Sequence, residues 1–321
     1  MKKGRLAPFY LLYGPGEFRL ENTLQRIREE YVPEGTRDFN LEIFYGDESD
    51  PGEIVNRALS LPFMAPNRLI IVRRTENFRA EQLERFLPYL DRPADSTCLL
   101  FVASRPDFRL RFFKKMRSLG RAVLFDELKE AQIPSWLSRR AGELGLNIDR
   151  EACAYLQQIV GNSLRELNGE LEKLLLRFGG EPVGMEQVRD LAIHSRVYTI
   201  FELVKVISMK DVPRSLGVLQ RFLDEEDKRG GPLRLVGMLN RQVKLLWKSR
   251  AVLDRGGHRR ELAGKLGPVH FLADELLNQA KKWTPTDLER ALELLYRADG
   301  HLKSGSRPRP ILENLILSLC G

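Results

Sequence analysis

Residues 9–24 read FYLLYGPGEFRLENTL, which is the order found in phosphate-binding loops: an apolar strand, a glycine-rich turn and an amphipathic helix. A working loop has the pattern G-x-x-x-x-G-K-[ST], because the Lys contacts the β- and γ-phosphates and the hydroxyl binds Mg²⁺. Counted from Gly14, the Lys position holds Leu20. Counted from Gly16, it holds Asn22. The sequence therefore predicts the backbone of an ATPase loop without the residues that perform its chemistry.

An acidic residue at the end of a buried strand is the second requirement of such a site, since it holds Mg²⁺ and orients the attacking water. The apolar run LIIV is followed by Arg73 and Arg74, and the run CLLFVA by Ser104 and Arg105. Arg19 could meet a phosphate, but a lone Arg more often faces solvent. The chain also lacks a G-x-S-x-G elbow, an H-E-x-x-H helix and an acidic cluster with metal spacing. We predict no catalytic residue, no cofactor and no metal.

The first 129 residues alternate strand and helix patterns. We expect strands at 9–13, 39–44, 68–73, 97–103 and 122–125. We expect helices at 17–31, 51–59, 80–90 and 109–118. Continuous apolar strands that alternate with helices are typical of a parallel sheet covered on both faces. The N-terminal part is therefore predicted to be an α/β domain.

From Lys129 onward the patterns are helical, and no strand is expected. Four helices, at 133–144, 150–160, 163–178 and 183–192, predict a small helical domain over 130–196. Further helices are expected at 200–208, 211–226, 232–254, 269–280, 284–300 and 310–320. Residues 197–321 are therefore predicted to form a third, all-helical domain, which gives an α/β plus all-α protein.

The charge of the chain is uneven, and it points to an acidic partner. The net charge is +8; residues 1–196 carry 30 Lys and Arg against 29 Asp and Glu, whereas residues 197–321 carry 22 against 15. A basic C-terminal third favours nucleic acid as a partner. A soluble helical domain with a modest basic excess explains the same numbers, so both interpretations stay open.

Other features of the composition indicate a cytoplasmic protein without a membrane segment. The three cysteines are widely spaced, no C-x-x-C occurs and the four His are scattered, so neither disulfides nor zinc are predicted. The apolar runs are much shorter than a membrane span. The N-terminus lacks the long apolar stretch and cleavage site of a signal peptide.

An apolar loop lies between the helix expected at 51–59 and the strand expected at 68–73. Its proline residues stop the helix and stiffen the chain. Large apolar side chains at the tip of a loop are costly if they face water. They either fold back into the core or dock in a pocket of a partner, as binding hot spots do. The candidate partner-binding residues are Leu61, Pro62, Phe63 and Met64.

A basic face on the helix expected at 232–254 is the candidate nucleic-acid contact. Its cations recur at spacings that share one side of a helix, opposite a stripe of Leu and Val. Phosphate contact would fix position without reading sequence, whereas an ordinary solvated face is the alternative. Together with the cations around Gly256 and Gly257, the candidates are Arg241, Lys244, Lys248, Arg255, Arg259 and Arg260.

Four segments together resemble one family over essentially the full length. They are LLYGPGEFRLE at 11–21, LSLPFMAPNRLIIVR at 59–73, GNSLRELNGELEKLLL at 161–176 and ADGHLKSG at 298–305. In these segments the chain resembles the delta subunit of bacterial DNA polymerase III, a subunit of the clamp loader. The resemblance rests on order and spacing, since none of the segments is a catalytic signature. Met64 stands where many relatives have an aromatic residue or Leu, and Gly169 interrupts a helix.

The resemblance implies an AAA+-like architecture. It implies a RecA-like domain at 1–129 with a degenerate nucleotide loop, a helical lid at 130–196 and a helical collar at 197–321. Family members do not hydrolyse ATP. The loop with Leu61, Phe63 and Met64 would enter the hydrophobic pocket of the β sliding clamp, and the collar would join the delta prime and tau/gamma subunits around primed DNA.

We therefore expect a non-ATPase subunit of the DNA polymerase III holoenzyme that binds and opens the clamp within the cytoplasmic, nucleoid-associated replisome. Two alternatives remain at this point. An active AAA+ ATPase of recombination or remodelling would bind ATP on its own. A stand-alone basic DNA-binding protein would bind DNA tightly, and with strong salt dependence, without partners.

Overall fold

The computed structural model describes residues 6–193, 196–225 and 230–321. The chain divides into two compact units, Met1–Leu128 and Lys129–Gly321. The predicted boundary between a lid at 130–196 and a collar at 197–321 falls inside the second unit, and it stays a prediction.

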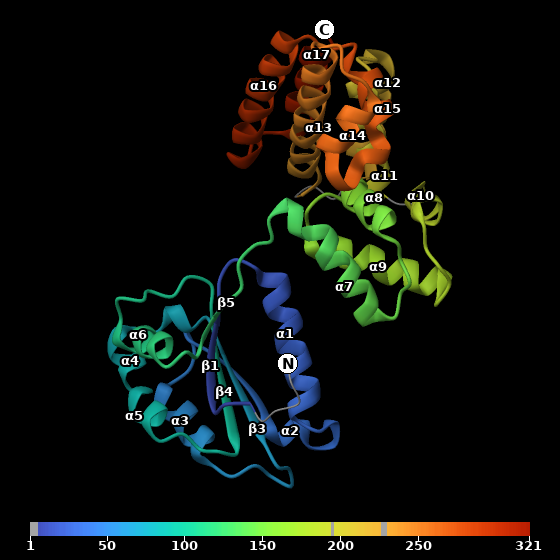
Figure 1. The fold of residues 1–321 in the computed structure, drawn as a ribbon. Coiled ribbons are helices and arrows are strands. Elements are labelled where there is room, and N and C mark those ends of the chain that lie inside the picture. Colours follow the sequence, from blue (N-terminus) through green and yellow to red (C-terminus); the bar gives the residue numbers. More distant parts are fainter. Residues whose placement is uncertain (1–5, 194–195, 226–229) are drawn as a thin grey trace. The chain divides into compact units, whose positions relative to one another are not determined.

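A parallel sheet forms the centre of the first unit, as the sequence predicts. In the described residues it has the order β2-β3-β4-β1-β5 (Figure 1). The strands are β1 Phe9–Tyr13, β2 Leu41–Tyr45, β3 Arg68–Arg73, β4 Thr97–Ala103 and β5 Ala122–Leu124. Because all strands run the same way, their carboxyl ends share one edge of the sheet and their amino ends share the other.

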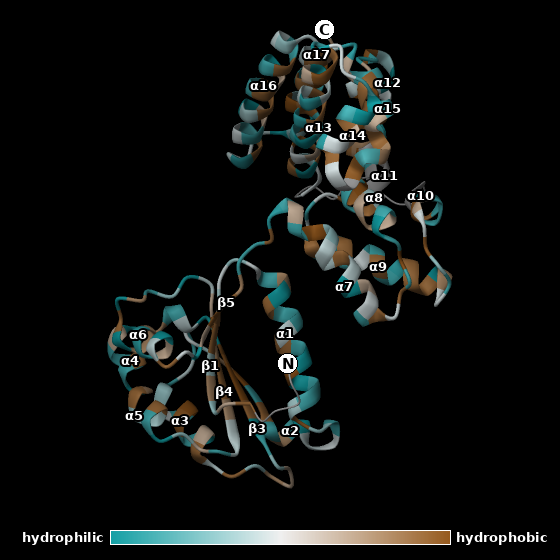
Figure 2. Cartoon of the chain, viewed as in Figure 1, coloured by the Kyte–Doolittle hydropathy of each residue, from teal (hydrophilic) through white to brown (hydrophobic). Residues whose placement is uncertain are grey.

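Helices cover both faces of this sheet, because side chains of a strand alternate between its faces. Leu69 and Ile71 of β3 pack with α1 (Glu17–Tyr31), whereas Ile70 and Val72 pack on the side of α3 (Pro51–Leu59). The strands are accordingly the most hydrophobic part of the unit (Figure 2). The remaining helices are α2 Arg37–Asn40, α4 Ala80–Glu84, α5 Leu87–Asp91 and α6 Arg111–Ser118.

Two local predictions in this unit are wrong. The helix expected at 80–90 is broken into α4 and α5. Pro88 lacks the N–H that a continuous helix would use there, and the break places Phe86 in the core between Phe78 and Phe101. The strand expected at 39–44 begins at Leu41 instead, because residues up to Asn40 form the short helix α2.

The second unit is helical, and a large hydrophobic cluster built mainly from its last seven helices forms its core. Among the described residues of this unit, an isolated β-bridge joins Ile148 and Val183. The helices are α7 Ile133–Leu144, α8 Arg150–Val160, α9 Leu164–Phe178, α10 Met185–Ile193, α11 Arg196–Ser208, α12 Val212–Glu225, α13 Gly231–Leu253, α14 Arg259–Leu266, α15 Ala273–Ala280, α16 Pro285–Lys303 and α17 Pro308–Cys320.

The region after α13 differs most from the prediction. The sequence pattern does not predict α14, and the helix expected at 269–280 is shorter, since residues Gly267–Leu272 form a 3₁₀ segment before α15. Gly267 has a φ of +60°, which ends α14. The predicted end of a helix at residue 226 lies outside the described residues. No helix in the described part of the chain has the length and apolar character needed to cross a membrane.

Candidate functional site

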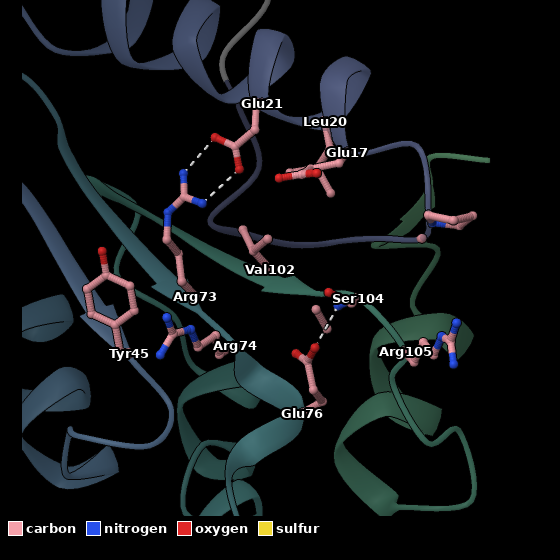
Figure 3. A pocket seen from close by; sticks show the side chains of 13 residues that line it. Glu17, Leu20, Glu21, Tyr45, Arg73, Arg74, Glu76, Val102, Ser104 and Arg105 are labelled. Atoms are coloured by element: carbon pink, nitrogen blue, oxygen red, sulfur yellow. Dashed lines mark hydrogen bonds and ion pairs between the residues drawn. The ribbon is translucent and has the colours of Figure 1, made fainter. Parts of the chain in front are cut away.

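A pocket of about 740 Å³ lies at the carboxyl edge of the sheet in the first unit (Figure 3). Open α/β sheets commonly bind ligands at this edge. The pocket is lined by Gly14, Pro15, Glu17, Leu20, Glu21, Tyr45, Arg73, Arg74, Glu76, Val102, Ala103, Ser104 and Arg105. The turn singled out in the sequence therefore borders a real cavity, in the place where a nucleotide would bind.

Two of the charged groups in this pocket, Arg73 and Glu21, are paired with each other. The Arg73 guanidinium donates two hydrogen bonds of 2.7 Å to the Glu21 carboxylate, and this contact raises the pKa of Arg73. Glu76 accepts a 2.9 Å hydrogen bond from the backbone N–H of Ser104. Leu20, at the expected Lys position, is buried. The pocket has the location of a nucleotide site, but neither a Lys nor a strand-end carboxylate in the places that the chemistry requires.

The glycines of the turn have a packing explanation. Gly14 has a φ of +120°, and a Cβ there would lie 2.4 Å from the carbonyl oxygen of Phe125. A Cβ on Gly16 would lie 2.6 Å from the carbonyl oxygen of Asp126, to which Arg19 also donates a 3.2 Å hydrogen bond. The chain that leaves β5 thus packs directly against the turn. Glycine is required by this close approach, whether or not a phosphate binds.

The apolar loop lies at the opposite, amino edge of the sheet, immediately before β3. The side chains of Leu61, Phe63 and Met64 are 81%, 54% and 83% exposed, and Pro62 is half-buried. Among the described residues, none of the four belongs to a core cluster of the first unit. The four predicted residues thus lie together at the surface of the first unit. They do not fold back into its core.

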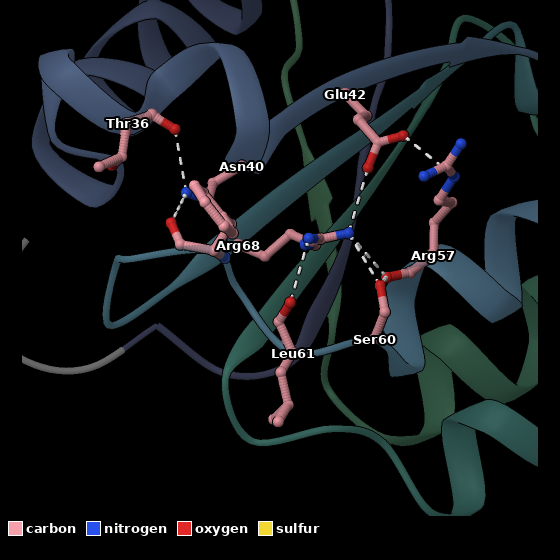
Figure 4. A network of polar contacts seen from close by, with 8 residues as sticks. Thr36, Asn40, Glu42, Arg57, Ser60, Leu61 and Arg68 are labelled. Carbon is pink, nitrogen blue, oxygen red and sulfur yellow. Dashed lines mark hydrogen bonds and ion pairs between the residues drawn. The ribbon is translucent and has the colours of Figure 1, made fainter.

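Arg68, the first residue of β3, holds the start of this loop. Its side chain is almost buried and donates hydrogen bonds to the Ser60 hydroxyl at 2.9 Å and to the carbonyl oxygens of Leu61 at 3.2 Å and Arg57 at 3.3 Å (Figure 4). Glu42 of β2 lies 3.3 Å away and balances the charge of Arg68. The backbone at residues 57–61 is therefore tied to the sheet, while the side chains of Leu59 and Leu61 stay exposed.

Asn40 holds the middle of the loop. This fully buried residue donates hydrogen bonds to the carbonyl oxygens of Phe63 at 2.8 Å and Thr36 at 2.9 Å, and it accepts one of 2.8 Å from the Phe63 N–H (Figure 4). Met64, the next residue, has a φ of +48°. This left-handed conformation costs a residue other than glycine about 1–2 kcal/mol. The surrounding contacts must supply that energy.

Phe39 is an exposed residue of this site that the sequence pattern does not reveal. Its ring is 59% exposed, and its centroid lies 5.2 Å from that of Phe63. In the sequence it reads as the first residue of the strand expected at 39–44. The clue available was the neighbouring Asn40, whose type favours local turns and caps over strands.

The predicted basic face divides into buried and exposed residues. Arg241 forms a 2.7 Å ion pair with Glu130 and donates a 2.9 Å hydrogen bond to the Gln157 carbonyl. These contacts stabilise the second unit and leave Arg241 largely buried. Burial lowers the pKa of Arg241, and Glu130 opposes that effect. Arg259 is exposed but paired with Asp274 at 2.7 Å.

The other cations of this face remain available. Within the part of the chain that the structure describes, no hydrogen bond or ion pair is found for Lys244, Lys248, Arg255 and Arg260, and all four are exposed. Lys244 and Lys248 lie one helical turn apart on α13, whereas Arg255 and Arg260 flank the glycine turn before α14. They are the members of the predicted set that could meet a phosphate.

Comparisons with known proteins agree over both units. A family model described as DNA polymerase III, delta subunit matches residues 10–127, and one described as DNA polymerase III delta subunit, C-terminal domain matches residues 198–319. The DNA polymerase III subunit delta of Bacillus subtilis is 25% identical over 99% of this chain and 94% of its own length. That of Escherichia coli is 23% identical over 98% and 92%.

A solved structure is also similar to the chain. The DNA clamp loader delta protein of Bacillus subtilis has 25% sequence identity and a TM-score of 0.60, covering 99% of this chain and 97% of that chain. The two-part architecture of an α/β unit followed by helices is therefore that of a known protein along nearly its whole length.

Proposed function

The chain belongs to the DNA polymerase III delta subunit family, as a component of the clamp loader, and from this premise we propose that residues 61–64 bind the β sliding clamp and favour its open form. The clamp would receive the loop tip in a hydrophobic pocket near its subunit interface. The single observation that carries the proposal is the exposure of Leu61, Phe63 and Met64 on a loop whose backbone is held by buried polar contacts.

The apolar side chains of the exposed tip would supply enough free energy for specific binding. An apolar side chain that moves from water into a pocket contributes about 1.5–3 kcal/mol. Two or three such side chains on a fixed backbone therefore supply several kcal/mol, and little of it is lost to ordering the loop. Contiguous exposed apolar patches, unlike single exposed side chains, often mark interaction sites.

The subunit would act mechanically and leave ATP hydrolysis to its partners. Two contacts in the pocket at the carboxyl edge support this proposal: the Arg73–Glu21 ion pair and the hydrogen bond from the Ser104 N–H to Glu76. ATP-bound subunits of the loader would expose or hide the tip, so that nucleotide state at one site changes clamp affinity at another. Such coupling between two sites is allosteric in the thermodynamic sense.

The helical second unit supplies the remaining contacts in this proposal. Its last helices would form the collar that joins the delta prime and tau/gamma subunits. Primed DNA, held in the assembled loader, would meet the exposed cations Lys244, Lys248, Arg255 and Arg260. Arg241 is left out of this set because it is paired inside the unit.

The test is clamp binding by the full chain and by the double variant Phe63→Ala, Met64→Ala. We expect the double variant to lose at least about 100-fold in affinity, which corresponds to about 2.8 kcal/mol, while its unfolding transition stays unchanged. Leu176→Ala is the matched control, because Leu176 is 86% exposed on α9 in the second unit. Equal clamp affinity of the double variant and the wild type would refute the assignment.

Four exposed cations that form no hydrogen bond or ion pair within the described residues also favour a second function, direct DNA binding by the isolated chain. That function predicts tight binding that weakens steeply with salt. A chain that binds DNA weakly alone, and strongly once the loader is assembled, supports the clamp-loader role instead. The two outcomes are separated by one titration with and without the partner subunits.

A further inference from the structure

We propose that Phe39 and Asn40 complete the partner-binding surface formed by residues 61–64. Asn40 would be a positioning residue that keeps the loop in its presented conformation before the partner arrives, and Phe39 would be a contact residue beside Phe63. This inference rests on the proposed function, since it assigns new residues to the same surface and to the same partner, the β sliding clamp.

The side chain of Asn40 acts on the loop as a neighbouring strand would. It lies 23 residues from Phe63 in sequence, yet it binds both the N–H and the carbonyl oxygen of that residue, each at 2.8 Å. Its second amide hydrogen is bound to the Thr36 carbonyl at 2.9 Å, so Asn40, the last residue of α2, connects the loop to the 3₁₀ turn Glu34–Thr36 that precedes this helix. An Asn amide offers two donors and one acceptor atom. Here both donors and the acceptor are engaged.

The left-handed backbone at Met64 needs this support. A residue with a side chain leaves a φ of +48° unless the surrounding structure fixes it. Asn40 fixes the preceding residue, Phe63, and Arg68 fixes Leu61 and Ser60. On the other side, β3 begins at Arg68 and is paired with both neighbouring strands. The strained residue is thus held from both directions, and its 83% exposed side chain is presented to solvent.

Phe39 extends the apolar surface from the loop to the start of the sheet. Its ring is inclined by 53° to the ring of Phe63, and both rings are more than half exposed. The residue that follows Phe39 is Asn40. One dipeptide therefore provides both an aromatic contact surface and the anchor of the loop, and neither side chain contributes to the apolar core clusters in the described part of the first unit.

A preformed loop predicts a particular kinetic signature. If only a fraction of free molecules has the competent loop conformation, the apparent affinity falls in proportion to that fraction. Loss of the anchor would then lower the association rate, whereas the bound state and its dissociation rate would change little. Loss of a contact residue has the opposite signature, because it accelerates dissociation.

The experiment measures clamp association and dissociation rates for the full chain and its variants Asn40→Ala and Phe39→Ala. For Asn40→Ala we expect an association rate lower by about 10-fold and faster hydrogen exchange at the Phe63 amide. For Phe39→Ala we expect dissociation faster by about 10-fold with Phe63 exchange close to wild type. Asn40→Asp keeps the acceptor for Phe63 N–H but loses both donors, so it should fall between wild type and Asn40→Ala.

Asn168→Ala is the matched control, because Asn168 is also a buried amide but binds Arg140 and Glu172 in the second unit. If Asn40→Ala does not fold, the rates of Asn40→Asp and Phe39→Ala decide the question. Failure of the wild type to bind the clamp would refute the proposed function itself. Wild-type rates for both Asn40 and Phe39 variants, with binding still abolished by Phe63→Ala, Met64→Ala, would leave that function standing and overturn this inference.

Discussion

The two edges of the parallel sheet treat their side chains in opposite ways. At the carboxyl edge, a pocket of about 740 Å³ is lined by charged groups, of which Arg73 and Glu21 bind each other. At the amino edge, polar groups such as Asn40 and Arg68 are buried beneath the loop and apolar side chains project from it. The carboxyl edge thus has a hollow of ligand size, and the amino edge has an exposed apolar surface.

This difference supports our proposal that the apolar loop at the amino edge, and not the hollow at the carboxyl edge, is the partner-binding surface. A carboxylate and a guanidinium joined by two hydrogen bonds offer less free charge to a ligand than unpaired groups do, and separating them costs free energy. Exposed apolar side chains need no such exchange, because water is their only competitor. The contrast can be tested at each edge in turn.

The largest expected effect is at the carboxyl edge, and it concerns stability. In Gly14→Ala the new Cβ would overlap the Phe125 carbonyl in a backbone conformation unsuited to alanine, so we expect the first unit to lose about 3 kcal/mol or more. Hydrogen exchange in β1 measures this loss. Gly35→Ala is the control, since a Cβ there meets nothing within 4 Å among the described residues. Wild-type stability of Gly14→Ala would contradict the packing role of the turn.

Arg68→Ala is expected to affect both stability and binding at the amino edge. The change removes a nearly buried cation and leaves the carbonyl oxygen of Leu61 without the donor that Arg68 supplies, at a cost of about 2–3 kcal/mol. Clamp affinity should fall with it, because the loop loses its connection to β3. Denaturation followed by circular dichroism, together with clamp titration, measures the two effects. A variant that loses stability but keeps full clamp affinity would show that Arg68 stabilises the fold without contributing to clamp binding.

Glu21→Gln should have a smaller effect, and only on stability. It replaces a charged two-bond contact with Arg73 by a neutral one in a half-exposed place, so we expect a loss of about 1–2 kcal/mol. Clamp binding should stay at the wild-type level, because Glu21 lies at the opposite edge of the sheet. Reduced clamp affinity in this variant, measured under conditions where it is fully folded, would show that the two edges are coupled.

Excess Mg-ATP should have no effect on the isolated chain. A nucleotide present at about 100 times its Kd would stabilise the protein by about 2.7 kcal/mol, which a melting experiment detects easily. The paired charges and the buried Leu20 predict an unchanged melting temperature. A clear rise in melting temperature with Mg-ATP would show that the pocket binds nucleotide despite these features.

Elements marked by strong local signals could be predicted from the sequence. Strands β1, β3 and β4 begin and end at the expected residues, because each is a continuous apolar run between turn residues. Helix α3 starts where expected, since Asp50 caps the backbone N–H groups of Gly52 and Glu53 and Pro51 follows it. The exposed tip was likewise predicted as one of two alternatives, from the cost of placing Leu, Phe and Met on a loop.

Features that depend on distant partners could not be predicted. Arg241 has the spacing of a surface cation on α13, but Glu130, far away in sequence, pairs with it. Asn40 precedes an apolar run and reads as part of the strand, because nothing local announces its contact with Phe63. Met64 has no intrinsic preference for a left-handed conformation. In each case tertiary contacts overrule the local pattern.

The position of Arg68 has a mechanical consequence. Its side chain connects Ser60 and Leu61 to the first residue of β3, and β3 is paired along its length with β2 and β4. Tension applied at the tip would therefore pass through a short link into two parallel ladders, which share the load instead of opening one bond at a time. Pulling at Leu61 in an optical trap should accordingly require a higher rupture force in the wild type than in Arg68→Ala. A chain built this way can transmit force from a few side chains to a stiff sheet.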